Sequence, residues 1–318
     1  MKRIFALMLA LLMLLTTFVA CSKEDGEDEG EGVDLTVSNT ELVYQPEGDY
    51  GDAFYYEYIN GDEVSIIGYS GSHVPHAITV PANITIGEKD FPVTDIATDA
   101  FKAKTNLTAV TLPDSVVAIG DMAFYGCISL ATVKMPASLT TIGTAAFAKC
   151  EALDGIVIPE AVTEIGEMAF YGCKTLSEIA LPEAVTVLPA QIFMNCENLW
   201  TVSWSEKGTK ICESAFMGCT LLKTFNFPET LEEIENFAFA TCAKLNTATI
   251  GEKVTKIGLN AFYDAALMNV TFVNQTGWRT YELLENQNFE NMTVTSTAEN
   301  AKNLSKDYCN FYWVLVTE

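Results

Sequence analysis

The chain has 318 residues, 49% of them hydrophobic, so it is long enough to bury a sizeable core, and length alone suggests about two domains. Its 42 acidic residues outnumber 18 basic ones and give a formal net charge of −24. This charge argues against nucleic-acid binding, which needs a basic surface, and against electrostatic adsorption to anionic lipid. The two histidines, His73 and His76, share one short Gly/Ser/Pro-rich stretch. We interpret that stretch as a loop rather than as a pair of metal ligands.

Residues 1–20 have the pattern of a secretory signal peptide. Two basic residues precede an apolar run over 4–15, which is too short for a membrane-spanning helix. The Phe-Val-Ala-Cys sequence that ends at Cys21 resembles a bacterial lipobox, with Phe18 at a position that is usually Leu. The resemblance implies that Cys21 is lipidated. The alternative is an ordinary signal peptide cleaved near Ala20, with a plain thiol at Cys21.

Residues 21–34 are interpreted as an acidic tether. The segment 22–32 contains six acidic residues, one Lys and no apolar residue, so it is expected to stay solvated. Its start also resembles the export signal that sends lipoproteins to the outer face of the outer membrane in one phylum of Gram-negative anaerobes. The resemblance implies a surface-exposed outer-membrane lipoprotein; a generic acidic linker facing the periplasm is the alternative.

The centre of the chain, 93–276, repeats every 23 residues through eight units in an unbroken register. Each unit has a Phe, with an Ile or Leu five residues before it and a Leu or Met six residues after it. One unit cannot bury its apolar face alone, so the units are expected to stack as a solenoid. The repeated residues are Phe101, Phe124, Phe147, Phe170, Phe193, Phe216, Phe239 and Phe262.

Each unit is expected to contain one strand, a second short extended piece and one helical or 3₁₀ turn. Residues 107–112 alternate apolar and polar residues in their second half and end at Pro113, which cannot donate to a strand ladder. Residues 116–120 form the second extended piece. The segment around Phe124 is too short for a long helix, so it is interpreted as a turn with Phe124 plugged into the core.

Residues 162–184 carry the pattern Val-x-x-Ile-Gly-x-x-Ala-Phe-x-x-Cys-x-x-Leu-x-x-Val-x-Leu-Pro almost completely. This pattern resembles the BspA-type leucine-rich repeat family. The resemblance implies a leucine-rich-repeat solenoid, β-rich with short helical turns. It also implies adhesion, since some members of the family bind host matrix or other cells. The fifth unit departs at Pro189 and Ser205 and the seventh at Glu235 and Gly251, which predicts local irregularity there.

The flanks 35–92 and 277–318 are interpreted as caps, because a solenoid exposes an apolar end unless something covers it. In the first flank, two alternating runs around Asn60-Gly61 predict a hairpin with a type I′ turn. Residues 78–80 and 84–86 resemble degenerate strands of a first coil. In the second flank, Ser296 or Thr297 is expected to cap a helix that runs through Leu304, and 311–315 to form a strand.

One column of the repeat is made of cysteines, three residues after each Phe. A single thiol per coil does not supply the convergent ligands of a zinc site, so the column is interpreted as buried small side chains. Neighbouring thiols come within disulfide reach without needing to pair. Cys212 and Cys309 fall outside the column. Its members are Cys127, Cys150, Cys173, Cys196, Cys219 and Cys242.

A second column is made of glutamates, one residue after the proline position of each unit. A divalent cation such as Ca²⁺ would relieve the repulsion between them, but we favour a solvated edge with side chains in water. A regular ladder lacks the cleft and acid–base asymmetry of a glycosidase, and no hydrolase, phosphate-loop or dinucleotide motif is present. We therefore predict no enzyme, no catalytic residue, no metal and no cofactor. The column is Glu160, Glu183, Glu206, Glu229 and Glu252.

The outward side of the repeat strands is the predicted ligand-binding surface. Trp200 breaks its own column and is a candidate anchor, although packing on a cap or loop is the alternative. Trp204 takes an inward position and is assigned to the core. Val270 and Phe272 fall on outward positions of the eighth unit and are expected to lie under the C-terminal cap. The candidate ligand-binding residues are Trp200, Thr201, Ser203, Thr224, Asn226, Thr247 and Thr249.

These expectations leave three functions open. The first is a cell-surface recognition and adhesion lipoprotein that binds a protein, either host matrix or another cell, through the solenoid. The second is a surface protein that captures glycans. The third is a structural envelope protein without a soluble ligand. The expected partners are a protein or glycan at the cell surface, with membrane contact through the lipid anchor only and no nucleic acid.

Overall fold

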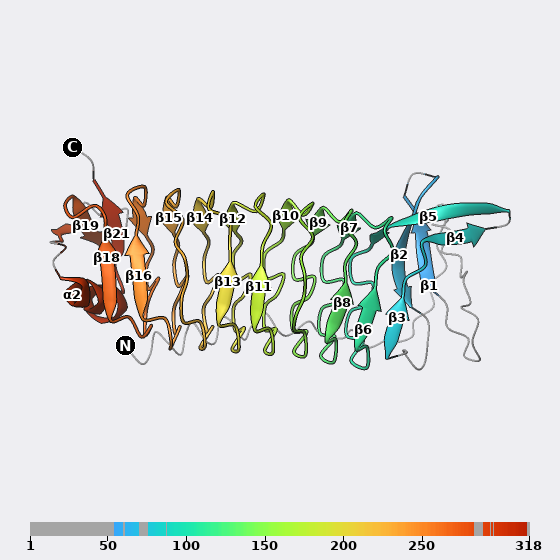
Figure 1. Cartoon of the computed structure of the whole chain (residues 1–318), viewed down its shortest axis with the longest axis horizontal. Helices are drawn as coiled ribbons and strands as arrows, with labels where there is room; N and C mark the ends of the chain where they lie inside the picture. Colours follow the sequence, from blue (N-terminus) through green and yellow to red (C-terminus); the bar gives the residue numbers. More distant parts are fainter. Residues whose placement is uncertain are drawn as a thin grey trace, which may run out of the picture. The chain divides into compact units, whose positions relative to one another are not determined.

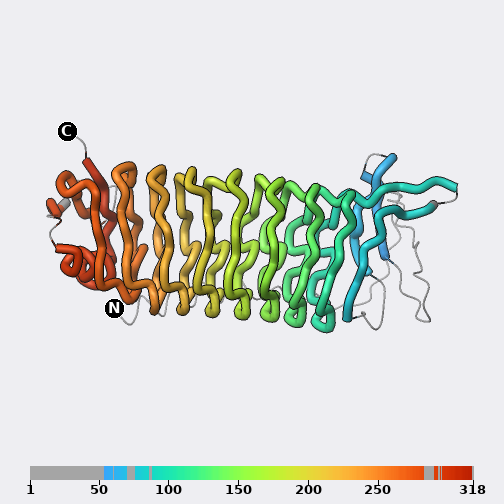
Figure 2. The backbone as a smooth tube through the Cα atoms, in the orientation of Figure 1, coloured from blue at the N-terminus to red at the C-terminus, as the bar shows by residue number. Residues whose placement is uncertain are grey.

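The computed structural model describes residues 54–59, 61–69, 76–86, 88–282, 289–292, 294 and 296–316. The repeats form a β-solenoid in which each 23-residue unit makes one coil, and successive coils stack in parallel (Figures 1 and 2). The predicted solenoid is therefore confirmed. We number the coils 1 to 8: 93–115, 116–138, 139–161, 162–184, 185–207, 208–230, 231–253 and 254–276.

One side of the solenoid, which we call the long-strand face, carries the Leu-x-x-Val-x-Leu segments. Its strands pair in parallel with a register of one coil, so that Val110 lies beside Val133 and Ile179 beside Val202. The middle residue of each strand is buried and its neighbours point outward. The strands are β3 (Ala77–Thr79), β6 (Ala109–Thr111), β8 (Thr132–Lys134), β11 (Glu178–Ala180), β13 (Thr201–Ser203), β16 (Thr247–Ile250) and β18 (Asn269–Phe272).

The second ladder, which we call the short-strand face, is built from the extended piece that precedes each turn. Two-residue strands pair in parallel from coil to coil and continue the longer strand of coil 1. The strands are β5 (Lys89–Ile96), β7 (Ala118–Ile119), β9 (Thr141–Ile142), β10 (Glu164–Ile165), β12 (Val187–Leu188), β14 (Lys210–Ile211), β15 (Glu233–Ile234) and β17 (Lys256–Ile257).

Pro189 explains why this second ladder divides between β10 and β12. In coil 4, the N–H of Gly166 donates to the carbonyl oxygen of Ile142 in the preceding coil at 2.8 Å. The equivalent residue of coil 5 is Pro189, which has no N–H to donate. The ladder from β10 therefore ends there, and a separate sheet begins at β12. The predicted irregularity of coil 5 is confirmed, with the missing donor as its cause.

A stack of phenylalanines fills the core. The rings of successive coils lie 5.1 to 5.8 Å apart between centroids and tilt by 1 to 23° from parallel. All eight rings are fully buried, and each contributes about 2–3 kcal/mol of burial free energy. The segments around them are turns, as expected: the N–H of Cys127 donates back to the Phe124 carbonyl oxygen at 3.1 Å, a spacing of three residues.

The long-strand face is interrupted twice, at coils 3 and 6, where the repeat pattern predicts strands. Residues 155–158 and 224–227 form no strand, so the face consists of three separate sheets. In coil 3 the interruption begins at Gly155, whose φ of +63° lies outside the strand region. In coil 6 the inward positions hold Phe225 and Phe227, which pack edge to face at 5.0 Å. These rings are bulkier than the aliphatic residues of other coils.

The register of coil 8 corrects the prediction of an unbroken 23-residue period. β18 pairs with β16 so that Asn269 lies beside Thr247 and Val270 beside Ala248, a step of 22 residues. Val270 and Phe272 therefore point into the core, at 0% and 3% exposure, rather than outward under a cap. A one-residue shift moves every side chain of a strand to the other face.

At the N-terminal end, β1 (Phe54–Tyr58) and β2 (Val64–Tyr69) form an antiparallel hairpin, and β2 pairs in parallel with β5. The last pair of the hairpin joins Tyr58 to Val64, so five residues lie between the strands. The expected hairpin is therefore confirmed, whereas Asn60, in its predicted type I′ turn, lies outside the described residues. The expected degenerate strands are present: β3 pairs with β6, and β4 (Asn83–Ile86) pairs antiparallel with β5.

At the C-terminal end, α2 (Thr297–Lys302) lies beside β18 of coil 8, and β21 (Tyr312–Leu315) and β19 (Trp278–Tyr281) lie near it (Figure 1). Ser296 caps α2, as expected, by accepting a hydrogen bond from the Glu299 N–H at 3.3 Å. The helical backbone continues as a π-helical turn over Asn303–Asp307. β21, the second predicted element of this flank, then pairs antiparallel with β17. β19 pairs with β21 and with β20 (Phe289–Asn291).

This segment supplies the hydrogen-bond acceptors that a ninth coil would have provided. The N–H groups of Asn260 and Asp264 donate to the carbonyl oxygens of Cys309 and Ser305, at 2.5 and 3.3 Å.

Within the described ranges, no helix has both the length and the apolar character to cross a bilayer.

Candidate functional site

The structure places all seven predicted ligand-binding residues on the outer surface of coils 5–7. Val202, Phe225 and Ala248 alternate with them and point into the core at 5 to 7% exposure. Thr201 is half-buried and the other six are exposed. The coil 6 pair, Thr224 and Asn226, lies on the segment that forms no strand. We call Trp200, Thr201, Ser203, Thr224, Asn226, Thr247 and Thr249 the polar strip.

The backbone of Trp200 is fixed by hydrogen bonds, whereas its side chain is half exposed to solvent. Its N–H donates to the Ser177 carbonyl oxygen at 3.0 Å, and its own carbonyl oxygen accepts from the Lys223 N–H at 3.4 Å. The side chain is 50% exposed. A tryptophan fixed at its root with a free ring has the properties of an interface anchor.

Trp204 lies four residues further on and has the opposite role. Its indole N–H donates to the Val185 carbonyl oxygen at 2.7 Å, and its ring packs 6.1 Å from that of Phe225. A Cβ on Gly208 would come within 2.4 Å of the Trp204 ring. The core assignment of Trp204 is confirmed.

The coil 8 register extends the polar surface beyond the residues predicted from sequence. Asn269 and Thr271 occupy the outward positions beside Thr247 and Thr249, and both are exposed. Met268, expected to be the inward residue, is 60% exposed. The sequence does hold a sign of this shift: Leu267, one residue before Met268, is also apolar. Leu267 is the residue that is partly buried against the core.

The cysteine column is buried, as expected, and its thiols are free. Burial raises the pKa of Cys127 to about 11 and that of Cys196 to about 12. Each Sγ–H donates to the carbonyl oxygen of a Phe in the preceding coil, at 3.0 to 3.2 Å. Thiols with raised pKa values in apolar surroundings are inert.

Cys212 lies outside this column, in the position that is Gly in coils 2, 3, 4 and 8. Its thiol is only half-buried. Burial raises its pKa to about 11, and the nearby Glu235 carboxylate adds to that rise. Cys309 is buried at 8% exposure, and its Sγ–H donates to the Lys306 carbonyl oxygen at 3.2 Å. Both are free thiols.

The glutamate column is fully solvated. All five side chains are exposed, and Glu183 makes an ion pair with Lys207 at 2.8 Å. Among the residues that the structure describes, no group of three or more His, Cys, Asp or Glu side chains converges on a metal-sized site. The solvated-edge interpretation fits this geometry.

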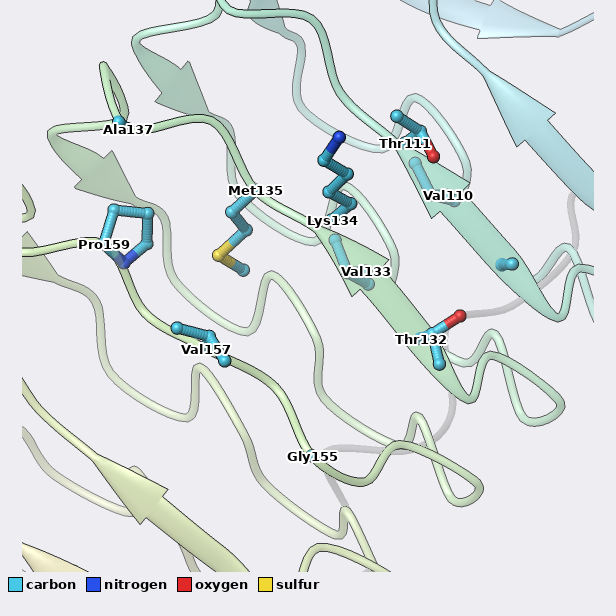
Figure 3. Close-up of a pocket in the computed structure, with 11 residues that line it drawn as sticks. Val110, Thr111, Thr132, Val133, Lys134, Met135, Ala137, Gly155, Val157 and Pro159 are labelled. Carbon is cyan, nitrogen blue, oxygen red and sulfur yellow. The ribbon is translucent and has the colours of Figure 1, made fainter.

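A hollow lies over coils 1–3 of the long-strand face, outside the polar strip. It has a volume of about 480 Å³. Met135 reaches from the end of β8 toward the part of coil 3 that carries Val157 and Pro159 (Figure 3). Lys134 is the charged side chain among its lining residues. Pattern reasoning missed this hollow because it depends on the missing strand of coil 3.

Three residues singled out in the sequence remain: Cys21, His73 and His76. Cys21 and His73 are outside the described ranges. His76 is within them, and its carbonyl oxygen accepts hydrogen bonds from the N–H groups of Thr108 and Ala109, at 2.6 and 3.0 Å. This residue helps to join β3 to coil 1 through its backbone.

The stacked coils, the parallel strand ladders and the core of repeated apolar residues define a leucine-rich repeat protein. The BspA type leucine rich repeat region matches residues 94–211 and 186–312. The chain therefore belongs to the BspA-type leucine-rich repeat family. No curated protein matches the chain.

Solved structures of leucine-rich repeat proteins are similar to this chain. One from Bacteroides ovatus is 29% identical with a TM-score of 0.66, over 71% of this chain and 58% of its own length. A leucine rich cell surface protein from Faecalibacterium prausnitzii is 28% identical with a TM-score of 0.54, over 82% and 63%. The chain thus spans less than two thirds of these two proteins. The leucine rich repeat protein TpLRR of T. pallidum is 27% identical with a TM-score of 0.50, over 67% and 86%.

Proposed function

We propose that this protein is a cell-surface recognition and adhesion lipoprotein that binds a protein partner through the long-strand face. One observation carries the proposal: Trp200 projects from a fixed backbone, half exposed, at the edge of the polar strip. Aromatic anchors surrounded by polar groups are typical of protein interfaces. Membership of a repeat family whose proteins present extended binding surfaces supports the same function.

The rigidity of the scaffold supports the proposal as well. The strip rests on a core of stacked rings, so its side chains are held in place before a partner arrives. Binding then costs less conformational entropy than it would for a flexible surface. The polar strip also carries no charged residue of its own in a chain with a net charge of −24, so its own side chains add no repulsion of an acidic partner.

The location is part of the proposal. A signal peptide over 1–20 and lipidation of Cys21 would place the solenoid on an acidic tether, 21–34, at the outer face of the outer membrane of a Gram-negative bacterium. A similar solved protein is described as a cell surface protein. Host matrix or another cell would then be within reach of the long-strand face.

Capture of a glycan is the second candidate, and one observation favours it. Thr201, Thr224, Thr247 and Asn269 stand in line on successive coils, with Ser203, Asn226, Thr249 and Thr271 beside them. Within this line, β16 and β18 pair in parallel, with Thr247 beside Asn269 and Thr249 beside Thr271. Paired parallel strands lie ~4.8 Å apart, so these four residues offer regularly spaced hydrogen-bonding groups to a polymer.

An array experiment separates the two candidates. Mature protein, wild type and Trp200→Ala, is applied to immobilised matrix proteins and to immobilised glycans. Binding to a matrix protein that falls at least tenfold in Trp200→Ala is the expected result, since a hot-spot aromatic contributes more than about 2 kcal/mol. Ala131→Ser, in the same column of coil 2, is the matched control and should bind like wild type. Glycan binding without protein binding would favour the second candidate, and binding to neither would leave a structural envelope role.

A second experiment tests the anchor and the location. Cys21→Ala is expected to release the protein from the membrane fraction, whereas Cys212→Ala should leave it there. Protease treatment of intact cells should remove the solenoid from wild-type cells. Retention of Cys21→Ala in the membrane, or protection of the wild type in cells with an intact outer membrane, would contradict the proposed location.

A further inference from the structure

The hollow over coils 1–3 differs chemically from the polar strip on the same face. Met135, Val157 and Pro159 line it with apolar groups (Figure 3). Val157 is 76% exposed, the highest value among the exposed large apolar side chains in the described part of the chain. A valine left in water within a hollow gains when an apolar group of a ligand covers it.

The backbone beside this valine is also available to a ligand. The Asp154 N–H donates to the Ala131 carbonyl oxygen at 3.3 Å, and beyond that bond residues 155–158 form no strand with either β8 or β11. Gly155 has a φ of +63°, and no atom lies within 4 Å of the place where its Cβ would stand. The N–H and C=O groups of 155–158 therefore take no part in a strand ladder, and the open space lies on the Cβ side of Gly155.

Lys134 gives the hollow its charge. Among the residues described, it makes no ion pair, and no acidic side chain lines the hollow. Lys134 is exposed, so a carboxylate beside it would form a solvated ion pair, which selects for negative charge and adds modest affinity. The complementary ligand is an apolar group with a carboxylate next to it.

We propose that the hollow binds an extended acidic peptide segment of the protein partner, with an aliphatic side chain on Val157 and Met135 and a carboxylate on Lys134. Such a segment supplies the apolar group, the charge and backbone amides for 155–158 within two residues. A sugar fits less well, because its many hydroxyls would lose water over an apolar surface without enough partners. This inference rests on the proposed function and adds the chemistry of the partner.

Selection from a random heptapeptide library displayed on phage, with the mature protein as bait, tests this proposal. Val157→Asp, at an exposed position and therefore expected to fold normally, serves as the counter-selection bait. Peptides with Leu, Ile or Val next to Asp or Glu are expected to be enriched. A synthetic peptide of the enriched sequence should bind about tenfold more weakly to Val157→Asp, which loses apolar cover, and about threefold more weakly to Lys134→Gln, as for a solvated ion pair.

The binding site is checked by the methyl resonance of Met135, which should shift when the peptide is added. Trp200→Ala, on the polar strip, should bind the peptide like wild type. Absence of enrichment, enrichment of basic sequences, or an unmoved Met135 methyl would overturn the proposal; so would capture of an acidic glycan in place of peptides. If the arrays show a protein partner lost in Trp200→Ala while no peptide is enriched, the hollow proposal fails and the recognition function stands. If a peptide is enriched but the arrays show no partner, the hollow proposal stands and the recognition function proposed for Trp200 fails.

Discussion

The thiol of Cys173 donates a hydrogen bond to the carbonyl oxygen of Phe147, 3.2 Å away in the preceding coil. The same contact joins the other five cysteines of the column to the phenylalanines of the coils before them. Each thiol thus satisfies a carbonyl group that faces the core, where an unpaired acceptor would be costly. In the six coils that carry the cysteine, the repeated spacing of Phe and Cys places each thiol against the phenylalanine carbonyl oxygen of the coil before it.

The column thiols are therefore expected to resist chemical modification in the folded protein. In native protein near pH 8, a maleimide should leave Cys173 and Cys196 unmodified, and both should react quickly in urea. Differential alkylation followed by mass spectrometry measures this site by site. Equal labelling rates in the native and unfolded states would contradict the buried geometry.

Alkaline pH is expected to destabilise the protein through the same thiols. Burial raises the pKa of Cys127 from about 9 to about 11. Between these values the unfolded chain has released the proton that the folded chain retains, so unfolding becomes easier as the pH rises. The loss is about 1.4 kcal/mol per pH unit for one such thiol.

The urea-unfolding free energy at pH 8 and pH 10 gives the measurement. In Cys127→Ala, the fall in unfolding free energy between the two pH values should be about 1 kcal/mol smaller than in wild type. Identical falls in the two proteins would show that this thiol does not contribute.

Gly166→Ala is expected to destabilise the solenoid by about 1–3 kcal/mol, as overpacking does. A Cβ at this position would lie 2.4 Å from the Thr144 backbone nitrogen and 2.7 Å from the Gly143 carbonyl carbon. The coils would have to separate. Where Cys212 replaces this glycine in coil 6, its N–H bond to the Leu188 carbonyl oxygen is already longer, at 3.0 Å.

Gly251→Ala is the matched control, because its Cβ would meet only the Pro228 carbonyl oxygen, at 3.8 Å. Its urea-unfolding free energy should stay within about 0.5 kcal/mol of wild type. The prediction fails if the two alanine variants have the same stability.

Tryptophan fluorescence is expected to separate Trp200 from the three other tryptophans of the chain. Its side chain is 50% exposed, whereas Trp278 and Trp313 are at 1% and 2%, and Trp204 donates its indole N–H within the protein. Acrylamide should quench one component of the emission strongly. Trp200→Phe should remove that component and leave the unfolding free energy nearly unchanged. A quenchable component that persists in this variant would show that another indole is exposed.

Leu304→Asp is expected to open the C-terminal end, at a cost of about 2 kcal/mol or more, since Leu304 is 2% exposed and a charge there has no partner. Hydrogen exchange of the Asn260 and Asp264 amides should accelerate, because their acceptors lie in the same segment. Lys306→Asp, on the exposed side of the same segment, is the control and should exchange like wild type. Unchanged exchange in Leu304→Asp would mean that the segment does not cover coil 8.

Much of the core could be predicted from the sequence because the core is periodic. The spacing of Phe124, Phe147 and Phe170 alone implies that identical side chains meet in neighbouring coils, and the structure stacks them at 5.2 and 5.8 Å. The burial of the cysteine column followed from the same spacing, as did the outward position of the polar strip and the packing of Trp204, which is partly buried, against the core. These are properties of the position within one unit.

The sequence-based predictions fail where the strand register between two neighbouring coils decides the outcome. Both Leu267 and Met268 are apolar, so the hydrophobic pattern did not distinguish a 23-residue step from a 22-residue step into coil 8. The pairing of Val270 with Ala248 decides it, because that register buries Val270 and Phe272 and leaves Asn269 outward.

The sequence by itself determined the repeat length, the inward residues and the side of each strand that meets water, because one unit encodes them locally through its alternation of apolar and polar residues. Only the tertiary structure decided where ladders break. A proline without a donor at 189 and a left-handed glycine at 155 each act on bonds to a neighbouring coil. The hollow beside Val157 arises from such a break, since its lining residues come from three coils that only stacking brings together.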